Sequence, residues 1–142
     1  MKTEKLALIV AAAKLPPLVP EVKHLWADGL CMRTMAHPAG TVVVGAEYKK
    51  SHIFYLVSGR ILVDIEGEAL ELTGGDMFVA KPGTQKAAYA LEDSTVACFY
   101  GTQSTNIVDL VAEFTTTEHR FLAGQPDNPL YIAQLKAELL EQ

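Results

Sequence analysis

The sequence has few of the residues that mark several common classes of protein. Its 142 residues include only two cysteines, Cys31 and Cys98, and neither belongs to a CxxC pair, so no structural zinc site is indicated. We interpret both as small buried hydrophobes, because free cysteine is among the residue types most often buried. A disulfide between them stays open as an alternative.

Concentrated positive charge and long apolar runs are also missing. The net charge is −5, and no basic cluster is longer than Lys49-Lys50. Nucleic-acid phosphates require a basic patch, so we expect no nucleic-acid partner. No apolar run is long enough to cross a bilayer, and we expect no membrane association. P-loop, Gly-x-Ser-x-Gly and dinucleotide-binding fingerprints are absent as well.

The middle of the chain consists of short runs with strand character. Between residues 21 and 103, β-branched and aromatic residues alternate with glycine, proline and acidic turns at intervals of roughly ten residues, which indicates a sandwich or barrel. Ser58-Gly59 is interpreted as a tight hairpin between "HIFYLV" and "RILVDI". The apolar positions that we expect to be buried are Val42, Val44, Phe54, Leu56, Ile61, Val63, Leu72, Phe78, Val96 and Phe99.

Helices are expected on both sides of these strands. Residues 3–14 carry apolar residues at helical spacing, and the proline-rich stretch 15–20 ends that helix. We expect the mature chain to retain this segment. A helix that ends at Phe114 is expected to begin at a Ser104 or Thr105 cap, and a last helix at an Asn128 cap.

Residues 39–100 resemble the cupin domain, a small jelly-roll barrel. Three motifs carry the resemblance, in order: "PAGTVVVG", "HIFYLVSGRILVDIEGE" and "LTGGDMFVAKPGTQKAAYALED". The resemblance implies a mainly-β, single-domain cupin-type jelly-roll β-barrel. Residues 1–20 would be an N-terminal helical arm, residues 21–103 the barrel, and residues 104–142 two C-terminal helices.

Metal-binding cupins carry three histidines and one carboxylate at fixed places in these motifs. By the resemblance, those places fall here on Ala46, Tyr48, His52 and Lys86. Alanine has no ligand atom and a lysine ammonium repels a cation, so the sequence favours a protein without a metal or other cofactor. The alternative is an enzyme with one divalent transition metal on His52, Tyr48 and either Tyr100 or Cys98.

The same positions also allow a site for a small anion. By the resemblance they point inward, so that the ligand-binding residues would be Tyr48, His52, Lys86 and Tyr100. In the simpler alternative, His52 is a hydrogen-bonded core histidine and Lys86 reaches solvent.

A narrower resemblance is to small cupin-like proteins of tailed bacteriophages. It is carried by Arg33, by Gly59-Arg60-Ile61, by Lys81 to Asp93 and by the acidic and apolar segment 105–114. It implies a non-catalytic structural or accessory component of a phage particle, located in the virion or the host cytoplasm. The expected partners are further copies of the chain, as a homo-oligomer, and other phage structural proteins.

Overall fold

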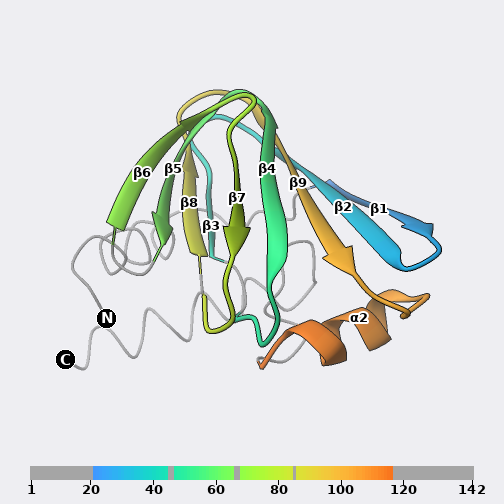
Figure 1. Ribbon diagram of the computed structural model, residues 1–142. Helices are drawn as coiled ribbons and strands as arrows, with labels where there is room; N and C mark the ends of the chain where they lie inside the picture. The colour runs from blue at the N-terminus through green and yellow to red at the C-terminus, as the bar shows by residue number, and fades with distance from the viewer. Residues whose placement is uncertain (1–20, 45–46, 66–67, 85, 117–142) are drawn as a thin grey trace, which may run out of the picture.

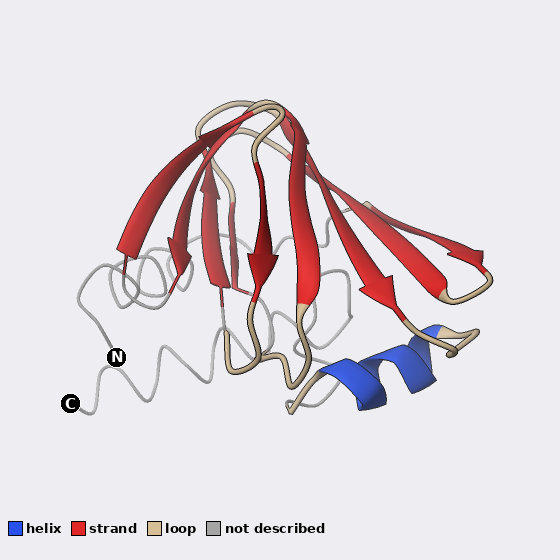
Figure 2. Cartoon of the chain, in the orientation of Figure 1, coloured by secondary structure: helices blue, strands red, loops and turns tan. Residues whose placement is uncertain are grey.

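Two antiparallel sheets and one helix make up the part of the chain that the computed structural model describes, residues 21–44, 47–65, 68–84 and 86–116 (Figures 1 and 2). One sheet has the strand order β1 (Val22–Ala27), β2 (Leu30–His37), β9 (Ser94–Gly101), β4 (His52–Ser58) and β7 (Met77–Ala80). The other has the order β3 (Val42–Val44), β8 (Lys86–Ala90), β5 (Arg60–Ile65) and β6 (Glu68–Thr73).

The mainly-β architecture predicted from the sequence is confirmed, but the closed barrel is not. No strand pairing joins the two sheets within the described residues, and each sheet ends in strands that pair on one side only. Figure 1 shows the strands converging at one end and the sheets spreading apart toward the other. A barrel has no edge strands, so this arrangement is an open sandwich.

The core lies between the two sheets and follows strand alternation. Phe54 and Leu56 of β4 face Ile61 and Val63 of β5, and all four side chains are buried. Every predicted core position whose side chain the structure describes is buried or half-buried, namely Phe54, Leu56, Ile61, Val63, Leu72, Phe78, Val96 and Phe99. The side chains of Val42 and Val44 lie outside the described set.

The connection at Ser58-Gly59 is not the predicted hairpin. It joins β4 of one sheet to β5 of the other, because β4 pairs with β7 and β9 while β5 pairs with β6 and β8. Gly59 has a φ of +93°, and a Cβ there would lie 2.2 Å from the Ser94 Oγ. The corner between the sheets therefore requires glycine on two grounds, backbone conformation and space.

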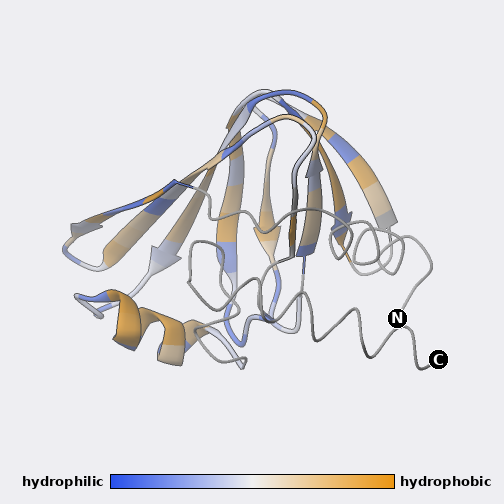
Figure 3. Ribbon diagram, turned by 180° about the vertical axis from the view of Figure 1, so that it is seen from behind, coloured by the Kyte–Doolittle hydropathy of each residue, from blue (hydrophilic) through white to orange (hydrophobic). Residues whose placement is uncertain are grey.

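The helix α2 (Ile107–Phe114) closes the spread end of the sandwich beside β9 (Figure 1). It begins at Asn106, whose side chain accepts a hydrogen bond from the Asp109 amide; the predicted Ser104 or Thr105 cap is wrong. The Ser104 hydroxyl instead donates to the Glu113 carboxylate, 2.9 Å away. The apolar face of the helix, orange in Figure 3, buries Leu110, Val111 and Phe114.

Glu113 fixes α2 to the strands. Besides Ser104, its carboxylate accepts hydrogen bonds from the Thr102 hydroxyl and, at 2.5 Å, from the Lys50 ammonium. The Lys50 and Thr102 hydrogen bonds lower the pKa of Glu113 to about 2. The backbone adds a further link, since the Lys49 amide donates to the Phe114 carbonyl oxygen at 2.6 Å.

Several sequence-based expectations concern other parts of the chain or absent features. The predicted helices at residues 3–14 and from Asn128 lie outside the described residues. Cys31 and Cys98 are buried and free, as expected of small hydrophobes. In the described part of the chain, no helix has the length and apolar character needed to cross a membrane.

Replacing Gly59 with alanine should strongly destabilise the fold. The change adds a strained positive φ and a steric clash with Ser94, so we expect the free energy of unfolding to fall by more than about 2 kcal/mol. Gly75→Ala is the matched control, because its φ of +104° is equally unfavourable but its Cβ would meet nothing within 4 Å. Urea unfolding measures both, and equal losses would contradict the close approach at the corner.

Replacing Glu113 with alanine should loosen α2. We expect a loss of about 1–3 kcal/mol in the free energy of unfolding, because three donors lose a charged acceptor. The control is Glu71→Ala, whose exposed ion pair with Arg60 at 3.3 Å should contribute about 0–1 kcal/mol. A loss at Glu113 no larger than at Glu71 would show that α2 is held by its apolar face alone.

Candidate functional site

The structure brings together four side chains that the sequence predicted as ligand-binding: Tyr48, His52, Lys86 and Tyr100. His52 and Lys86 begin β4 and β8, on different sheets, and Tyr100 lies near the end of β9. Tyr48 precedes β4 and is held by backbone hydrogen bonds to the turn before β8, from its amide to the Thr84 oxygen and from the Gly83 amide to its own oxygen. Their role in binding stays a prediction.

Aromatic rings form one side of this cluster. The Tyr48 and Tyr100 hydroxyls lie 3.1 Å apart and share a hydrogen bond. The His52 ring packs beside both tyrosines, with its centroid 4.3 Å from that of Tyr48 and 5.2 Å from that of Tyr100, and the two tyrosine centroids are 6.1 Å apart. Phe114 of α2 meets Tyr100 edge-on at 5.0 Å. The cluster thus lies at the end of the sandwich that α2 covers.

Lys86 is hydrogen-bonded to His52. The Lys86 Nζ lies 2.9 Å from the His52 Nε2, and it sits over the faces of Tyr48 and Phe54 at 5.2 and 5.4 Å from their ring centroids. A lysine amine can only donate when it is charged, so the Nε2 must accept and the imidazole must be neutral.

The ionisation of this pair reflects its surroundings. Burial, then the charges of Lys86 and Arg33, lower the pKa of His52 to about 3, which keeps the ring neutral at physiological pH. Burial is also the largest influence on Lys86, and with the charge of Arg33 it lowers the pKa of the amine to about 8. His52 is almost fully buried, whereas Lys86 keeps partial exposure.

Arg33 also belongs to this cluster, although the cupin motifs did not predict it as a ligand position. It lies on β2, with its guanidinium carbon 5.9 Å from the Tyr100 ring centroid. Burial opposes its charge, but Tyr100, Tyr48 and Cys98 act in the opposite direction, and the net pKa is raised. The sequence held a signal, because alternation places Arg33 on the same strand face as the buried Cys31 and Met35.

These residues do not fit a transition metal. The described part of the chain holds no group of three histidine, cysteine or carboxylate side chains that could bind a metal ion. The one imidazole nitrogen that faces the cluster, the His52 Nε2, already accepts a hydrogen from Lys86. A second cation, Arg33, adds to the repulsion. Ala46, the remaining expected ligand position, lies outside the described residues.

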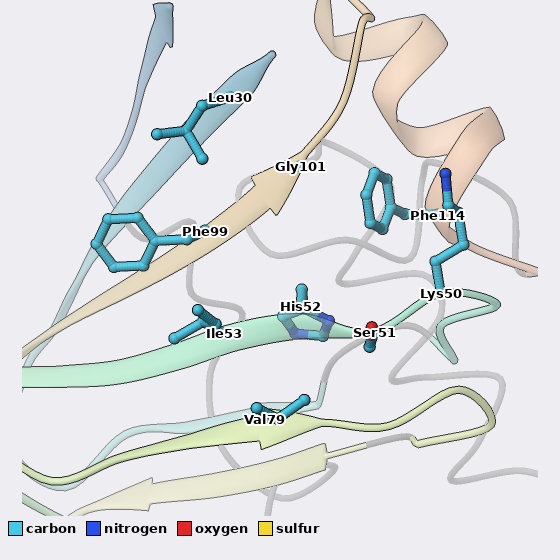
Figure 4. A pocket seen from close by; sticks show the side chains of 9 residues that line it. All are labelled: Leu30, Lys50, Ser51, His52, Ile53, Val79, Phe99, Gly101 and Phe114. Atoms are coloured by element: carbon cyan, nitrogen blue, oxygen red, sulfur yellow. The ribbon is translucent and has the colours of Figure 1, made fainter.

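A depression of about 570 Å³ adjoins this cluster, and His52 forms part of its lining (Figure 4). Most of its lining is apolar and comes from the five-stranded sheet, with Phe114 of α2 at one end. Ile53 and Val79 in this lining are about half exposed, so they lie on the solvent side of the sheet. The Lys50 ammonium in the lining forms an ion pair with Glu113. The lining therefore offers a ligand no cation without a carboxylate partner, unlike the cluster with Lys86 and Arg33.

Comparison with solved structures identifies the class of fold, whereas no protein-family model and no curated protein sequence matches the chain. KdgF from Halomonas sp. is 26% identical, with a TM-score of 0.52 over 73% of this chain and 84% of KdgF. An RmlC-like cupin from Shewanella frigidimarina is 19% identical, with a TM-score of 0.51 over 73% and 82% of the two chains. Salicylate 1,2-dioxygenase from Pseudoaminobacter salicylatoxidans is 17% identical, with a TM-score of 0.57, and the match covers 78% of this chain but 32% of the dioxygenase.

The described part of the chain therefore belongs to the class of mainly-β proteins with two antiparallel sheets. Within that class it has the RmlC-like cupin fold, as the sequence motifs predicted. None of these matches supports the narrower resemblance to phage proteins.

The neutral state of His52 should make the fold sensitive to acid. Its pKa is lower in the folded than in the unfolded chain, so the unfolded chain binds the extra proton as the pH falls from 6.5 toward 3, and stability is lost over that range. Between pH 7 and pH 5 we expect a contribution of about 2 kcal/mol to the loss.

Urea unfolding of the wild type and of His52→Gln at the two pH values measures this contribution. Glutamine can still accept the hydrogen from Lys86 but does not titrate, so the loss should be smaller by about 2 kcal/mol. Lys86→Met should reduce the loss as well, because it removes the neighbouring charge. An unchanged pH dependence in both variants would contradict a neutral buried His52.

Proposed function

We propose that this cupin binds a small organic anion between Lys86 and Arg33, inside the covered end of the sandwich. The observation that carries the proposal is a pair of cationic side chains in the interior with no carboxylate against them in the described part of the chain. The side chains that influence the pKa of Lys86 are Cys98 and Arg33, and those that influence the pKa of Arg33 are Tyr100, Tyr48 and Cys98. Asp64 is buried, but strand alternation places it on the other face of its sheet from Ile61 and Val63.

Electrostatics favour an anion at this place. Burial is the main cause of the lowered pKa of Lys86, and the like charge of Arg33 lowers it further. A carboxylate beside them would relieve the repulsion and form charge-assisted hydrogen bonds, with the arginine able to contact both carboxylate oxygens. The protein itself supplies no such group among the described residues.

The aromatic rings narrow the class of ligand. Tyr48, Phe54 and Tyr100 present flat apolar faces next to the cations, and the tyrosine hydroxyls can donate or accept hydrogen bonds. A short carboxylate with a small polar substituent fits this combination better than a bare inorganic ion. Sites for small molecules commonly combine apolar surfaces with a few fixed polar groups in this way.

The comparisons support a small-molecule role over the phage-particle role that the sequence predicted. Salicylate 1,2-dioxygenase, one of the fold neighbours, is an enzyme by name, and no match favours a virion component. The second candidate is therefore the metal-dependent enzyme centred on His52. The donor set speaks against it, since Lys86 uses the nitrogen that a metal would need.

Lactate is a suitable probe, because it is a short carboxylate with one hydroxyl and no reactive carbonyl. We expect saturable binding by calorimetry at pH 7, at least tenfold weaker in Arg33→Met and in Lys86→Met. Binding should also weaken above pH 8, where Lys86 loses its charge. Lys81→Met is the control, because Lys81 is exposed in the turn before β8 and should leave the affinity unchanged.

Circular dichroism and urea unfolding of each variant separate lost binding from lost folding. Absence of saturable binding in the wild type, or equal weakening by Lys81→Met, would overturn the anion site. Elemental analysis of protein purified without chelator or affinity metal addresses the second candidate. Near one equivalent of a transition metal, lost in His52→Gln, would replace the anion proposal with the metal enzyme.

A further inference from the structure

We propose that Lys86 is a nucleophilic amine that forms a Schiff base with a small 2-oxo acid. The inference rests on the proposed anion site and adds covalent chemistry to it. Three features of the cluster lead to it: the fixed position of the amine, its access to the neutral form, and a neighbouring cation that can hold a carboxylate.

The amine is held in position by its contacts. One of its hydrogens is donated to the His52 Nε2 at 2.9 Å, and the faces of Tyr48 and Phe54 lie to its sides. In the neutral amine the remaining lone pair must point away from the imidazole, since a hydrogen occupies that direction. Lys86 is half-buried as a residue, so it is not fully closed off from solvent.

The neutral form of the amine is the nucleophile, and its surroundings make it accessible. Burial and the charge of Arg33 lower the pKa of Lys86 to about 8. About a tenth of the amine is then neutral at pH 7, whereas an ordinary surface lysine is neutral to roughly 0.04%. Lysines activated in this way, by desolvation and a nearby cation, are the kind that form Schiff bases in enzymes.

Arg33 determines the class of carbonyl compound. Its charge influences both His52 and Lys86, which places it in the same cluster as the nucleophile. A guanidinium binds a carboxylate through two parallel hydrogen bonds. A 2-oxo acid carries its ketone carbon next to the carboxylate, so that anchoring the acid group on Arg33 presents the carbonyl carbon to Lys86.

The step balances without an oxidant or a reductant. The lone pair of the Lys86 nitrogen forms a bond to the carbonyl carbon, and the C=O π electrons move to oxygen, which takes up one of the amine hydrogens. The resulting carbinolamine loses its hydroxyl together with the second hydrogen as water, and the C=N bond forms.

Reduction by sodium borohydride traps the adduct. The wild-type protein is incubated with pyruvate at pH 7.5, reduced and digested, and the peptides are analysed by mass spectrometry. We expect one adduct, on Lys86, at least tenfold more abundant than on the exposed Lys81. Labelling of Lys86 should rise up to about pH 8 and then level off, following the lowered pKa of its amine.

Two controls isolate the contribution of each group. Lactate should give no adduct but should compete with pyruvate for the site. Arg33→Met keeps Lys86 in place, and it should lower labelling by pyruvate at least tenfold more than labelling by acetaldehyde, which has no carboxylate. Lys86→Met should abolish the adduct, and the Arg33 variant keeps the inference testable if the lysine variant does not fold.

The outcomes separate this inference from the function on which it rests. Saturable lactate binding with no trapped adduct at Lys86 would overturn the Schiff base and leave the anion site standing. Equal labelling of Lys86 and Lys81 would also overturn it. If lactate does not bind and pyruvate does not label Lys86, both proposals fail. If lactate does not bind but Lys86 is labelled equally by pyruvate and acetaldehyde, the amine is reactive but the anion site fails.

Discussion

The hydrogen bond between Lys86 and His52 is the interaction on which the interior of this protein depends. It joins the first residues of two strands that belong to different sheets, at the end where the sheets spread apart. It also fixes the imidazole as neutral and leaves the charge on lysine, so the cluster has cationic character without a histidine charge. The stacked tyrosines and Arg33 complete the cluster, and the anion that we propose to bind there would balance its positive charge.

The same backbone positions serve a different chemistry in metal-binding cupins. At those positions this chain places a lysine where its amine reaches the remaining histidine, so the donor atoms point at each other and not at a shared centre. A metal site needs several lone pairs converging on one point. Lys86 and Arg33 carry hydrogen-bond donors instead, and donors of this kind are what an anion requires.

The strands could be predicted from the sequence because their signals are local. Runs of β-branched residues between glycine turns predicted the elements from β1 to β9, and the motif order predicted the cupin fold. The errors concern relations across space. Ser58-Gly59 has the composition of a hairpin, but only the sheet pairing shows that it is a corner. Serine is a favoured residue at helix N-caps, but the Ser104 hydroxyl donates its hydrogen bond to Glu113, nine residues further along the chain.

The site was predictable to the extent that it followed the motif positions. Tyr48, His52 and Lys86 came from counting along the motifs and Tyr100 was added from the last strand, and the structure brings the four side chains together. Arg33 lies on a strand before the motifs, and its membership depends on the pairing of β2 with β9. The pKa values of His52 and Lys86 could not be predicted from the motif positions. They are lowered by burial and by neighbouring positive charges, which depend on the folded structure.

The attachment of α2 gives the site a mechanical link to the surface. Phe114 touches Tyr100 edge-on, Thr115 pairs with Tyr48 as an isolated bridge, and the Lys49 amide holds the Phe114 carbonyl oxygen. The C-terminal end of the helix thus contacts both tyrosines, Tyr100 through the ring of Phe114 and Tyr48 through the backbone of Thr115. A change in the distance between these two rings would therefore move the end of the helix. In this way a rearrangement in the interior would be transmitted to the surface of the protein.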